Sequence, residues 1–280
     1  MKRIYDFSRT PARRNYTISD LRALKGSGKT LTMSNPDTTD QVKACVEAGI
    51  DLLLVDDENM DEVRRVAPTH FMGTGATWAT FDSDDQIIAH AYECMRKGSD
   101  IYYTLRSFEL MERMAREGIP IRSHIGLIPT FSHYCGGLRG WGRKADEAMK
   151  IFQTLKRMED IGVVMVEVEC VAEEVLAAIN EKTTVVTCSL GAGKSADVIF
   201  SFIEDVCGEA SEEEKLPKHA HAFGSVGRLH QQIHDERVAA LGKFQTEVEA
   251  QNFPYKENNI RMHDGEHEKF LEALDKWTPA

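Results

Sequence analysis

The sequence predicts a (β/α)8 TIM barrel, an α/β fold in which parallel strands alternate with helices. From about residue 29, short β-rich runs alternate with longer stretches of helical periodicity, as in parallel strands joined by crossover helices. Several runs are almost continuously apolar, such as 50–55, which is typical of strands covered on both faces. A doubly wound open sheet is the competing architecture, but the dinucleotide fingerprint expected after its first strand is missing.

Each predicted strand is a short run rich in β-branched, aromatic or leucine residues, and each predicted helix is an amphipathic segment. The expected strands are 30–35, 51–57, 70–76, 100–105, 120–125, 163–169 and 184–189. The expected helices between and after them are 39–48, 60–66, 84–97, 108–117, 144–161, 171–181 and 196–207. A helix at 18–25, before the first strand, is expected to close the bottom of the barrel.

We predict one barrel domain over residues 1–280, with 209–280 as a C-terminal helical extension. Residues 208–216 form an acidic, solvated connection, and 226–250 and 264–275 are expected to be helices. A tail of about 65 residues with few apolar clusters would make a poor independent core.

The composition excludes several classes of function. The 280 residues carry 34 Lys and Arg against 45 Asp and Glu, a net charge of −11, which argues against nucleic-acid or anionic-membrane partners and favours small molecules. No apolar run approaches the ~18 residues of a spanning helix, and the first residues lack the apolar segment of a signal peptide. The six cysteines contain no CxxC pair, so we expect reduced thiols in a cytoplasmic protein.

In such a barrel, polar residues at the carboxyl ends of strands are the first candidates for chemistry. Asp56, Asp57 and Glu58 end the second strand, where three adjacent acids predict a divalent cation, or else a solvated helix start. Ser123 and His124 end the fifth strand, where the imidazole could donate to a substrate oxygen or only to a neighbouring carbonyl.

Two carboxylates share one face of the sixth strand. Alternation sends Glu167 and Glu169 to the same side, which is costly unless that face is functional or has cationic partners. Partial desolvation beside other acids should raise the pKa of Glu169 and suit it to proton transfer.

Two glycine-rich segments also draw attention. Residues 191–195 follow the seventh strand and are expected to open a helix near Ala196, so Gly191 and Gly193 mark either a carboxylate or phosphate site or a plain turn. The loop 135–143 has four glycines, and its Arg139 could pair with an anion or another subunit.

At these residues the chain resembles the ketopantoate hydroxymethyltransferase family of the phosphoenolpyruvate mutase and isocitrate lyase superfamily. Residues 124–129 resemble its GH(I/L)GLTPQ segment, and 136–143 resemble its GGYKVQGR segment. Residues 168–171 resemble LECVP, 191–193 resemble GIGAG, and 217–254 resemble the PKF…VYP tail, so the resemblance covers roughly 17–262.

The resemblance implies a homo-oligomeric enzyme of pantothenate biosynthesis. In that family a small 2-oxo acid binds Mg²⁺ or another divalent cation, loses a proton to become an enolate, and takes a one-carbon unit from methylenetetrahydrofolate. Carried over by position, Asp57 is a metal ligand, Glu169 the general base and His124 a residue of the substrate pocket.

The sequence also departs from the family pattern. Glu58 stands at a substrate-binding serine, Gly75 at the second metal aspartate, and Tyr103 and Leu105 at a lysine and a glutamate. We therefore expect a metal site that is reduced, or rebuilt around Asp57 and Glu58 with Asp56 as a further candidate. The substrate-binding set that we expect is Ser123, Glu58, Tyr103, Gly191, Gly193 and Arg139.

Three functions are compatible with these residues. The first is hydroxymethyl transfer to a small 2-oxo acid. The second is a C–C lyase or hydrolase of the same superfamily, which uses the same enolate chemistry without folate. The third is a catalytically silent paralogue with a binding or assembly role, favoured by the missing aspartate and lysine and opposed by the survival of Asp57, His124 and Glu169.

Overall fold

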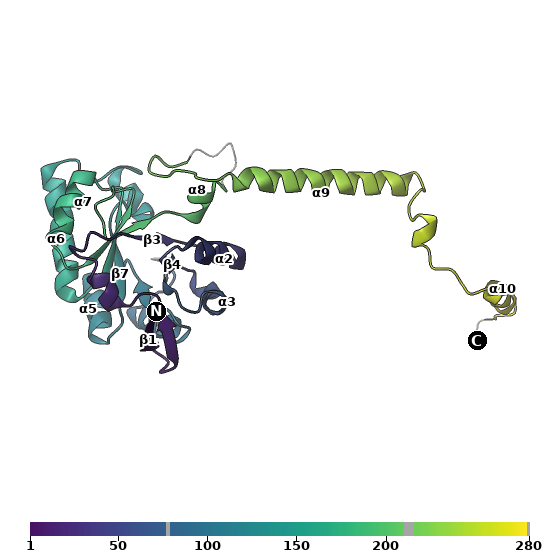
Figure 1. Ribbon diagram of the computed structural model, residues 1–280, viewed down its shortest axis with the longest axis horizontal. Helices are drawn as coiled ribbons and strands as arrows, with labels where there is room; N and C mark the ends of the chain where they lie inside the picture. The colour runs from purple at the N-terminus through teal and green to yellow at the C-terminus, as the bar shows by residue number, and fades with distance from the viewer. Residues whose placement is uncertain (77–78, 210–215, 279–280) are drawn as a thin grey trace. The chain divides into compact units, whose positions relative to one another are not determined.

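The computed structural model describes residues 1–76, 79–209 and 216–278, which form two compact units, Met1–Ser225 and Val226–Ala280. The first unit contains a closed barrel of parallel strands with helices around it (Figure 1). The predicted fold class is therefore confirmed. Within the described ranges, no helix is both long and apolar enough to cross a membrane.

The barrel strands follow chain order around the cylinder, and the last strand pairs with the first. All neighbours are parallel, so the carboxyl ends of all the strands meet at one rim, where barrel enzymes place their active sites. The strands are β3 (Leu31–Ser34), β4 (Leu52–Leu54), β5 (Phe71–Gly75), β6 (Ile101–Tyr103), β7 (Ile121–Gly126), β8 (Met165–Glu169), β9 (Val186–Leu190) and β10 (Val198–Phe200).

The helices around the barrel bury one face each against the outer face of the strands, in two apolar clusters. Thr38 and Ser83 start their helices with capping boxes, in which side chain and backbone satisfy each other's free N–H groups. The helices are α2 (Thr39–Ala48), α3 (Met60–Val66), α4 (Asp84–Arg96), α5 (Phe108–Arg116), α6 (Ala145–Ile161), α7 (Glu173–Asn180) and α8 (Ile203–Cys207).

The segment 196–207, expected to be one helix, is instead the strand β10 followed by the short helix α8. The turn at 191–195 therefore leads into a strand, and the expectation that it opens a helix is wrong. A strand of three residues is too short for its alternation to be told from helical periodicity. Closure of the barrel decides the conformation, because β10 bridges β9 and β3.

The chain before β3 closes one end of the barrel, as predicted. An antiparallel hairpin that the sequence did not indicate, β1 (Lys2–Tyr5) and β2 (Pro11–Arg14), precedes α1 (Ile18–Arg22). Leu21 and Leu24 are buried in the same apolar cluster as the residues that fill the barrel interior.

The second unit consists of helices, as expected for 226–250 and 264–275. It contains α9 (Val226–Glu249), the 3-10 turn η3 (Lys256–Asn258) and α10 (Glu266–Asp275). Neither α9 nor α10 has a buried residue. The acidic connection expected at 208–216 falls mostly on residues 210–215, which lie outside the described ranges.

A buried ionic network ties the hairpin to the barrel. The Asp100 carboxylate accepts hydrogen bonds from Arg14 Nε at 2.8 Å, from Arg64 Nη2 at 3.0 Å and from the Met72 N–H at 3.1 Å. The Arg14 side chain is only 3% exposed, so Asp100 is the counter-charge that makes its burial possible.

We predict that Asp100→Asn lowers the free energy of unfolding by roughly 3 kcal/mol, because it leaves Arg14 buried without its counter-charge. The control is Asp85→Asn, which removes the same charge from a surface pair with Arg113 and should cost at most ~0.5 kcal/mol. Urea denaturation of both variants measures the difference. Equal losses would contradict the prediction.

Candidate active site

Two neighbouring strands bring three titratable side chains together at the carboxyl-terminal rim of the barrel. His124 on β7 and Glu167 on β8 are register partners, and Glu169 lies two residues further along the same face of β8. All three are buried, and one nitrogen or oxygen atom from each lies within 4.8 Å of the corresponding atoms of the other two. The expectation that Glu167 and Glu169 share a face is confirmed, and Glu169 lies beside His124.

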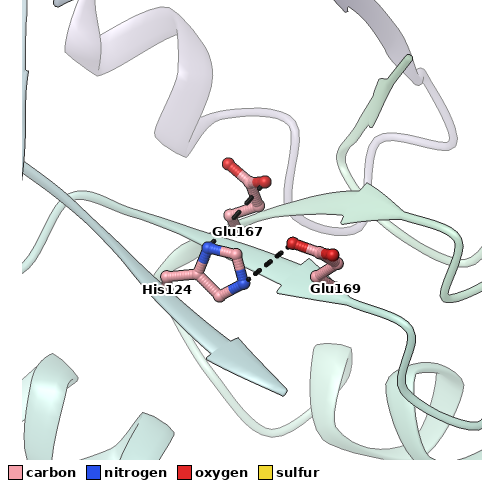
Figure 2. Close-up of side chains that lie close together, drawn as sticks. All are labelled: His124, Glu167 and Glu169. Atoms are coloured by element: carbon pink, nitrogen blue, oxygen red, sulfur yellow. Dashed lines mark ion pairs between the residues drawn. The ribbon is translucent and has the colours of Figure 1, made fainter. Parts of the chain in front are cut away.

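The imidazole of His124 lies between the two carboxylates (Figure 2). Its Nε2 is 2.6 Å from the carbonyl oxygen of Leu127, which can only accept, so Nε2 carries the proton. Nδ1 is then the acceptor for the Tyr103 hydroxyl at 3.1 Å. Glu169 Oε2 lies 3.4 Å from Nε2 and Glu167 Oε1 lies 3.8 Å from Nδ1. Backbone and hydroxyl therefore hold the ring as a neutral, oriented imidazole.

A buried arginine lies beneath this group. Arg122, two residues before His124 on β7, is fully buried and pairs through Nη2 with Glu167. Its guanidinium lies over the rings of Tyr103 and Phe200, 5.5 and 5.4 Å from the ring centroids. The cationic partner that two carboxylates on one barrel face require is therefore present, and it belongs to Glu167 rather than Glu169.

Burial controls the protonation of the two groups at the rim. Burial, and then the charge of Glu167, raise the pKa of Glu169 to about 8, in the direction that the sequence predicts. Burial lowers the pKa of His124. At neutral pH, Glu169 is therefore a carboxylic acid beside a neutral imidazole, and the charge in this part of the barrel is confined to the pair of Arg122 and Glu167.

The other residue predicted beside His124 lies apart from this group. Ser123 lies between two inward-pointing residues of β7, so its side chain points to the outer face of the barrel. Its buried Oγ has no hydrogen-bond partner in the described part of the chain. Tyr103, in contrast, joins the group through its bond to His124.

The predicted metal residues lie after β4. Asp57 begins the 3-10 turn η1 (Asp57–Asn59), and its Oδ2 is 2.9 Å from Nε2 of His90 on α4. The other nitrogen of His90 is 2.8 Å from the Tyr102 hydroxyl. Glu58 is exposed to solvent. Asp57 is thus already paired with His90, a histidine that the sequence pattern did not single out.

Close packing around Gly75 explains why this chain lacks the second metal aspartate of the family pattern. A Cβ on Gly75 would lie 2.2 Å from the carbonyl oxygen of Tyr103, so the packing of β5 on β6 excludes a side chain there. Asp57 and Glu58 remain as hard oxygen donors, and Mg²⁺ accepts one or two carboxylates when water and substrate complete its shell. The donor chemistry of these residues allows a weak cation site, in which Asp57 is also the partner of His90.

A second donor group fits a cation less well. Within the described ranges, His124, Glu167 and Glu169 are the one set of three His, Cys, Asp or Glu side chains gathered closely enough to share an ion. However, Glu167 is paired with Arg122, and the His124 Nε2 proton is bonded to Leu127. We therefore interpret this set as a group that handles protons.

The remaining predicted binding residues lie on loops near the rim. Gly191 and Gly193 both have positive φ, and Ser189 fixes their turn by donating to the Gly193 carbonyl at 2.7 Å. Arg139 pairs with Glu147 at 2.6 Å and, like His124, lines a cavity of about 780 Å³.

Comparison with known proteins identifies the family of the chain. A family model described as ketopantoate hydroxymethyltransferase matches residues 59–256. The chain belongs to this family. It is 26% identical to 3-methyl-2-oxobutanoate hydroxymethyltransferase of Deinococcus radiodurans, over 95% of this chain and 99% of that one. It is 27% identical to the protein of the same name from Halorhodospira halophila, over 87% and 94% of the two chains.

A solved structure shares the fold. A candidate phosphonomutase from Burkholderia cenocepacia is 10% identical, with a TM-score of 0.50 over 81% of this chain and 98% of that one. The segment of the chain that matches the ketopantoate hydroxymethyltransferase family model begins directly after Asp57 and Glu58 and includes His124 and Glu169. The family assignment therefore rests on the part of the barrel that holds the buried group.

The sequence pattern did not lead to Arg122, which the structure places at the centre of the group. The available signal was its spacing, because a residue two positions before His124 on one strand points to the same face. Two opposite charges on the inner faces of neighbouring barrel strands, here Arg122 on β7 and Glu167 on β8, indicate a buried ion pair.

We predict that Glu167→Gln lowers the pKa of Glu169 by roughly one unit or more, because it removes a neighbouring negative charge and leaves Arg122 unneutralised. Burial remains, so the pKa should stay above the ordinary value for Glu. NMR titration of ¹³C-labelled glutamate side chains measures it, with Glu174→Gln on the exposed face of α7 as the control. An unchanged or higher pKa in Glu167→Gln would refute this electrostatic explanation.

Proposed function

We propose that this chain is a hydroxymethyltransferase that acts on a small 2-oxo acid through an enolate, with methylenetetrahydrofolate as the one-carbon donor. The observation that carries the proposal is the buried Glu169 carboxyl at the rim, with its pKa raised to about 8 and a neutral His124 beside it. Such a group is suited to exchange a proton with a weak carbon acid.

Glu169 takes the proton in the proposed reaction. In its ionised form it removes the proton from C3 of the 2-oxo acid, and the electron pair of the C–H bond moves toward the C2 oxygen to give the enolate. The resulting carboxylic acid is the form that burial and Glu167 already favour, so proton transfer into Glu169 is assisted by its surroundings. Water releases the one-carbon unit from methylenetetrahydrofolate as formaldehyde, which breaks both of its C–N bonds and leaves tetrahydrofolate. Carbon C3 of the enolate then bonds to this carbon, and the alkoxide that forms takes back the proton from Glu169 to give the hydroxymethyl product.

In this scheme His124 is a positioning residue, a neutral ring held beside Glu169. Because Leu127 and Tyr103 occupy its two nitrogens, the ring stays neutral and fixed 3.4 Å from Glu169 Oε2. It presents a dipole to Glu169 without adding a charge that would lower the pKa of this carboxyl. A divalent cation held by Asp57 and Glu58 would polarise the carbonyl of the 2-oxo acid when it is bound.

The resemblance also favours a homo-oligomer, and we propose one here. The helices α9 and α10 expose large apolar side chains along their length, and exposed apolar side chains that gather into a patch mark interaction sites. These residues are Leu229, Ile233, Leu241 and Phe244 on α9 and Phe270 and Leu274 on α10.

The proton-transfer step is tested by hydrogen–deuterium exchange at C3 of 3-methyl-2-oxobutanoate, followed by NMR with Mg²⁺ present and no folate. We predict exchange above the metal-only background that Glu169→Gln abolishes and Glu174→Gln leaves unchanged. The rate should rise about tenfold per pH unit below the pKa of about 8 and level off above it, because the base must be ionised.

Addition of methylenetetrahydrofolate then separates the candidate enzymes. A hydroxymethyl product supports transfer, whereas exchange without that product indicates a lyase or hydrolase that shares the enolate step. No exchange with any of several 2-oxo acids and with Mg²⁺, Mn²⁺ or Co²⁺ would end the enzymatic proposal and leave the silent paralogue.

Cation binding is the next prediction. Titration calorimetry with Mg²⁺ or Mn²⁺ in the presence of the 2-oxo acid should show weak binding, because few protein carboxylates contribute. We expect Asp57→Asn to remove this binding and Asp61→Asn, an exposed neighbour on α3, to keep it. Equal binding by Asp57→Asn would rule out Asp57 as a ligand.

The assembly is measured directly by light scattering after size-exclusion chromatography. We predict a mass that is a multiple of the 31.5 kDa chain, and a lower multiple when Phe244 and Leu241 are replaced by Ser. A wild-type mass of one chain at micromolar concentration would contradict the proposal.

A further inference from the structure

A second cavity lies beside the cavity that His124 lines, and the two share Gly140, Trp141 and Arg143 in their walls. It has a volume of about 360 Å³ and lies where β8 and β9 end, at Cys170 and Gly191. Neither His124 nor Glu169 lines it. Its size is at the lower end of the range for small-molecule sites.

The charge of this cavity is opposite to that of the whole chain. Arg143, Lys218 and His219 line it, and no Asp or Glu is among its described lining residues. The chain as a whole has 45 acidic and 34 basic residues, so a cavity with two permanent cations and no acid departs from the composition. Positive potential focused in a concave, partly desolvated space attracts anions.

The walls of the cavity are fixed by close packing. His219 is seated on Gly191, whose φ is +69°, and a Cβ at Gly191 would lie 2.6 Å from the His219 Cβ. The Cys170 Sγ is 3.5 Å from His219 Nδ1. Cys170 itself has a φ of +50°, which is rare for a residue with a side chain and is often found at functional sites.

Backbone bonds hold Cys170 in this conformation. Its N–H donates to the Leu190 carbonyl at 2.9 Å, and its own carbonyl accepts from the Trp141 N–H at 2.8 Å. The glycine-rich loop before α6 and the segment after residue 216 are thus both placed against the ends of two barrel strands.

We propose that this cavity binds a small organic or inorganic oxyanion, a carboxylate or a phosphate. Arg143 can offer a planar fork of N–H donors and Lys218 a mobile ammonium, the two kinds of group that bind such oxygens. The sequence suggested an anion site at Gly191 on the N-terminus of a helix. That helix does not exist, and side-chain cations supply the charge instead. The proposal does not depend on the reaction proposed above.

Titration calorimetry with inorganic phosphate and, separately, acetate tests the proposal on the full chain. We expect at least one probe to bind, with affinity about tenfold lower in Lys218→Gln and in Arg143→Gln. Lys194→Gln is the matched control, because Lys194 is exposed on the same loop as Gly191 but does not line the cavity. Binding of one probe alone identifies the preferred oxyanion.

The Cys170 thiol provides a readout at the cavity itself. Bound anion should slow alkylation of Cys170 by iodoacetamide several-fold, measured by mass spectrometry of its peptide, in the wild type and Lys194→Gln but not in Lys218→Gln. Three results would each overturn the proposal. Neither probe binds at 10 mM, or Lys194→Gln loses as much affinity as Lys218→Gln, or a bound probe leaves the alkylation rate of Cys170 unchanged.

Discussion

The buried pair of Arg122 and Glu167 is the constraint on which the rest of the rim depends. A guanidinium with no exposed surface is tolerated in a barrel only beside a carboxylate and against polarisable rings, which Glu167, Tyr103 and Phe200 supply. Burial beside this pair lowers the pKa of His124, so its imidazole stays neutral. Burial, and then the charge of Glu167, raise the pKa of Glu169, so its carboxyl stays protonated at neutral pH.

The strand register makes this arrangement possible. The pairing of β7 with β8 sets His124 opposite Glu167 and Gly126 opposite Glu169. Gly126 is required there, since its φ is +92° and a Cβ would lie 2.3 Å from the Glu169 carbonyl oxygen. A slip of one residue would turn all of these side chains to the other face, so barrel closure and the chemistry of the rim are specified together.

The sequence predicted the parts of the fold that depend on local pattern. Apolar runs such as that of β4 and capping signals such as Ser83 are visible in one dimension. The strand β10 was not predicted, because only its pairing with β3 and β9 makes three residues a strand. The hairpin β1–β2 is similar, since its stability depends on Arg14 reaching Asp100, 86 residues away.

The same distinction holds for the site. His124 and Glu169 could be predicted because they lie in the carboxyl-terminal halves of apolar strands, and the carboxyl ends of the strands meet at one rim. The partners that decide their protonation could not, because Arg122 meets Glu167 across 45 residues and His90 meets Asp57 across 33. The charge of the second cavity has the same origin, since Arg143 and Lys218 come from separate loops.

The central claim is that the barrel holds Glu169 as a neutral carboxylic acid at neutral pH. Difference infrared spectroscopy of the wild type and Glu169→Gln measures this directly through the carbonyl stretch of a protonated carboxyl. We expect the band at pH 7, its absence from the variant, and its loss as the pH rises through about 8. A wild type that lacks the band at pH 7 would contradict this claim.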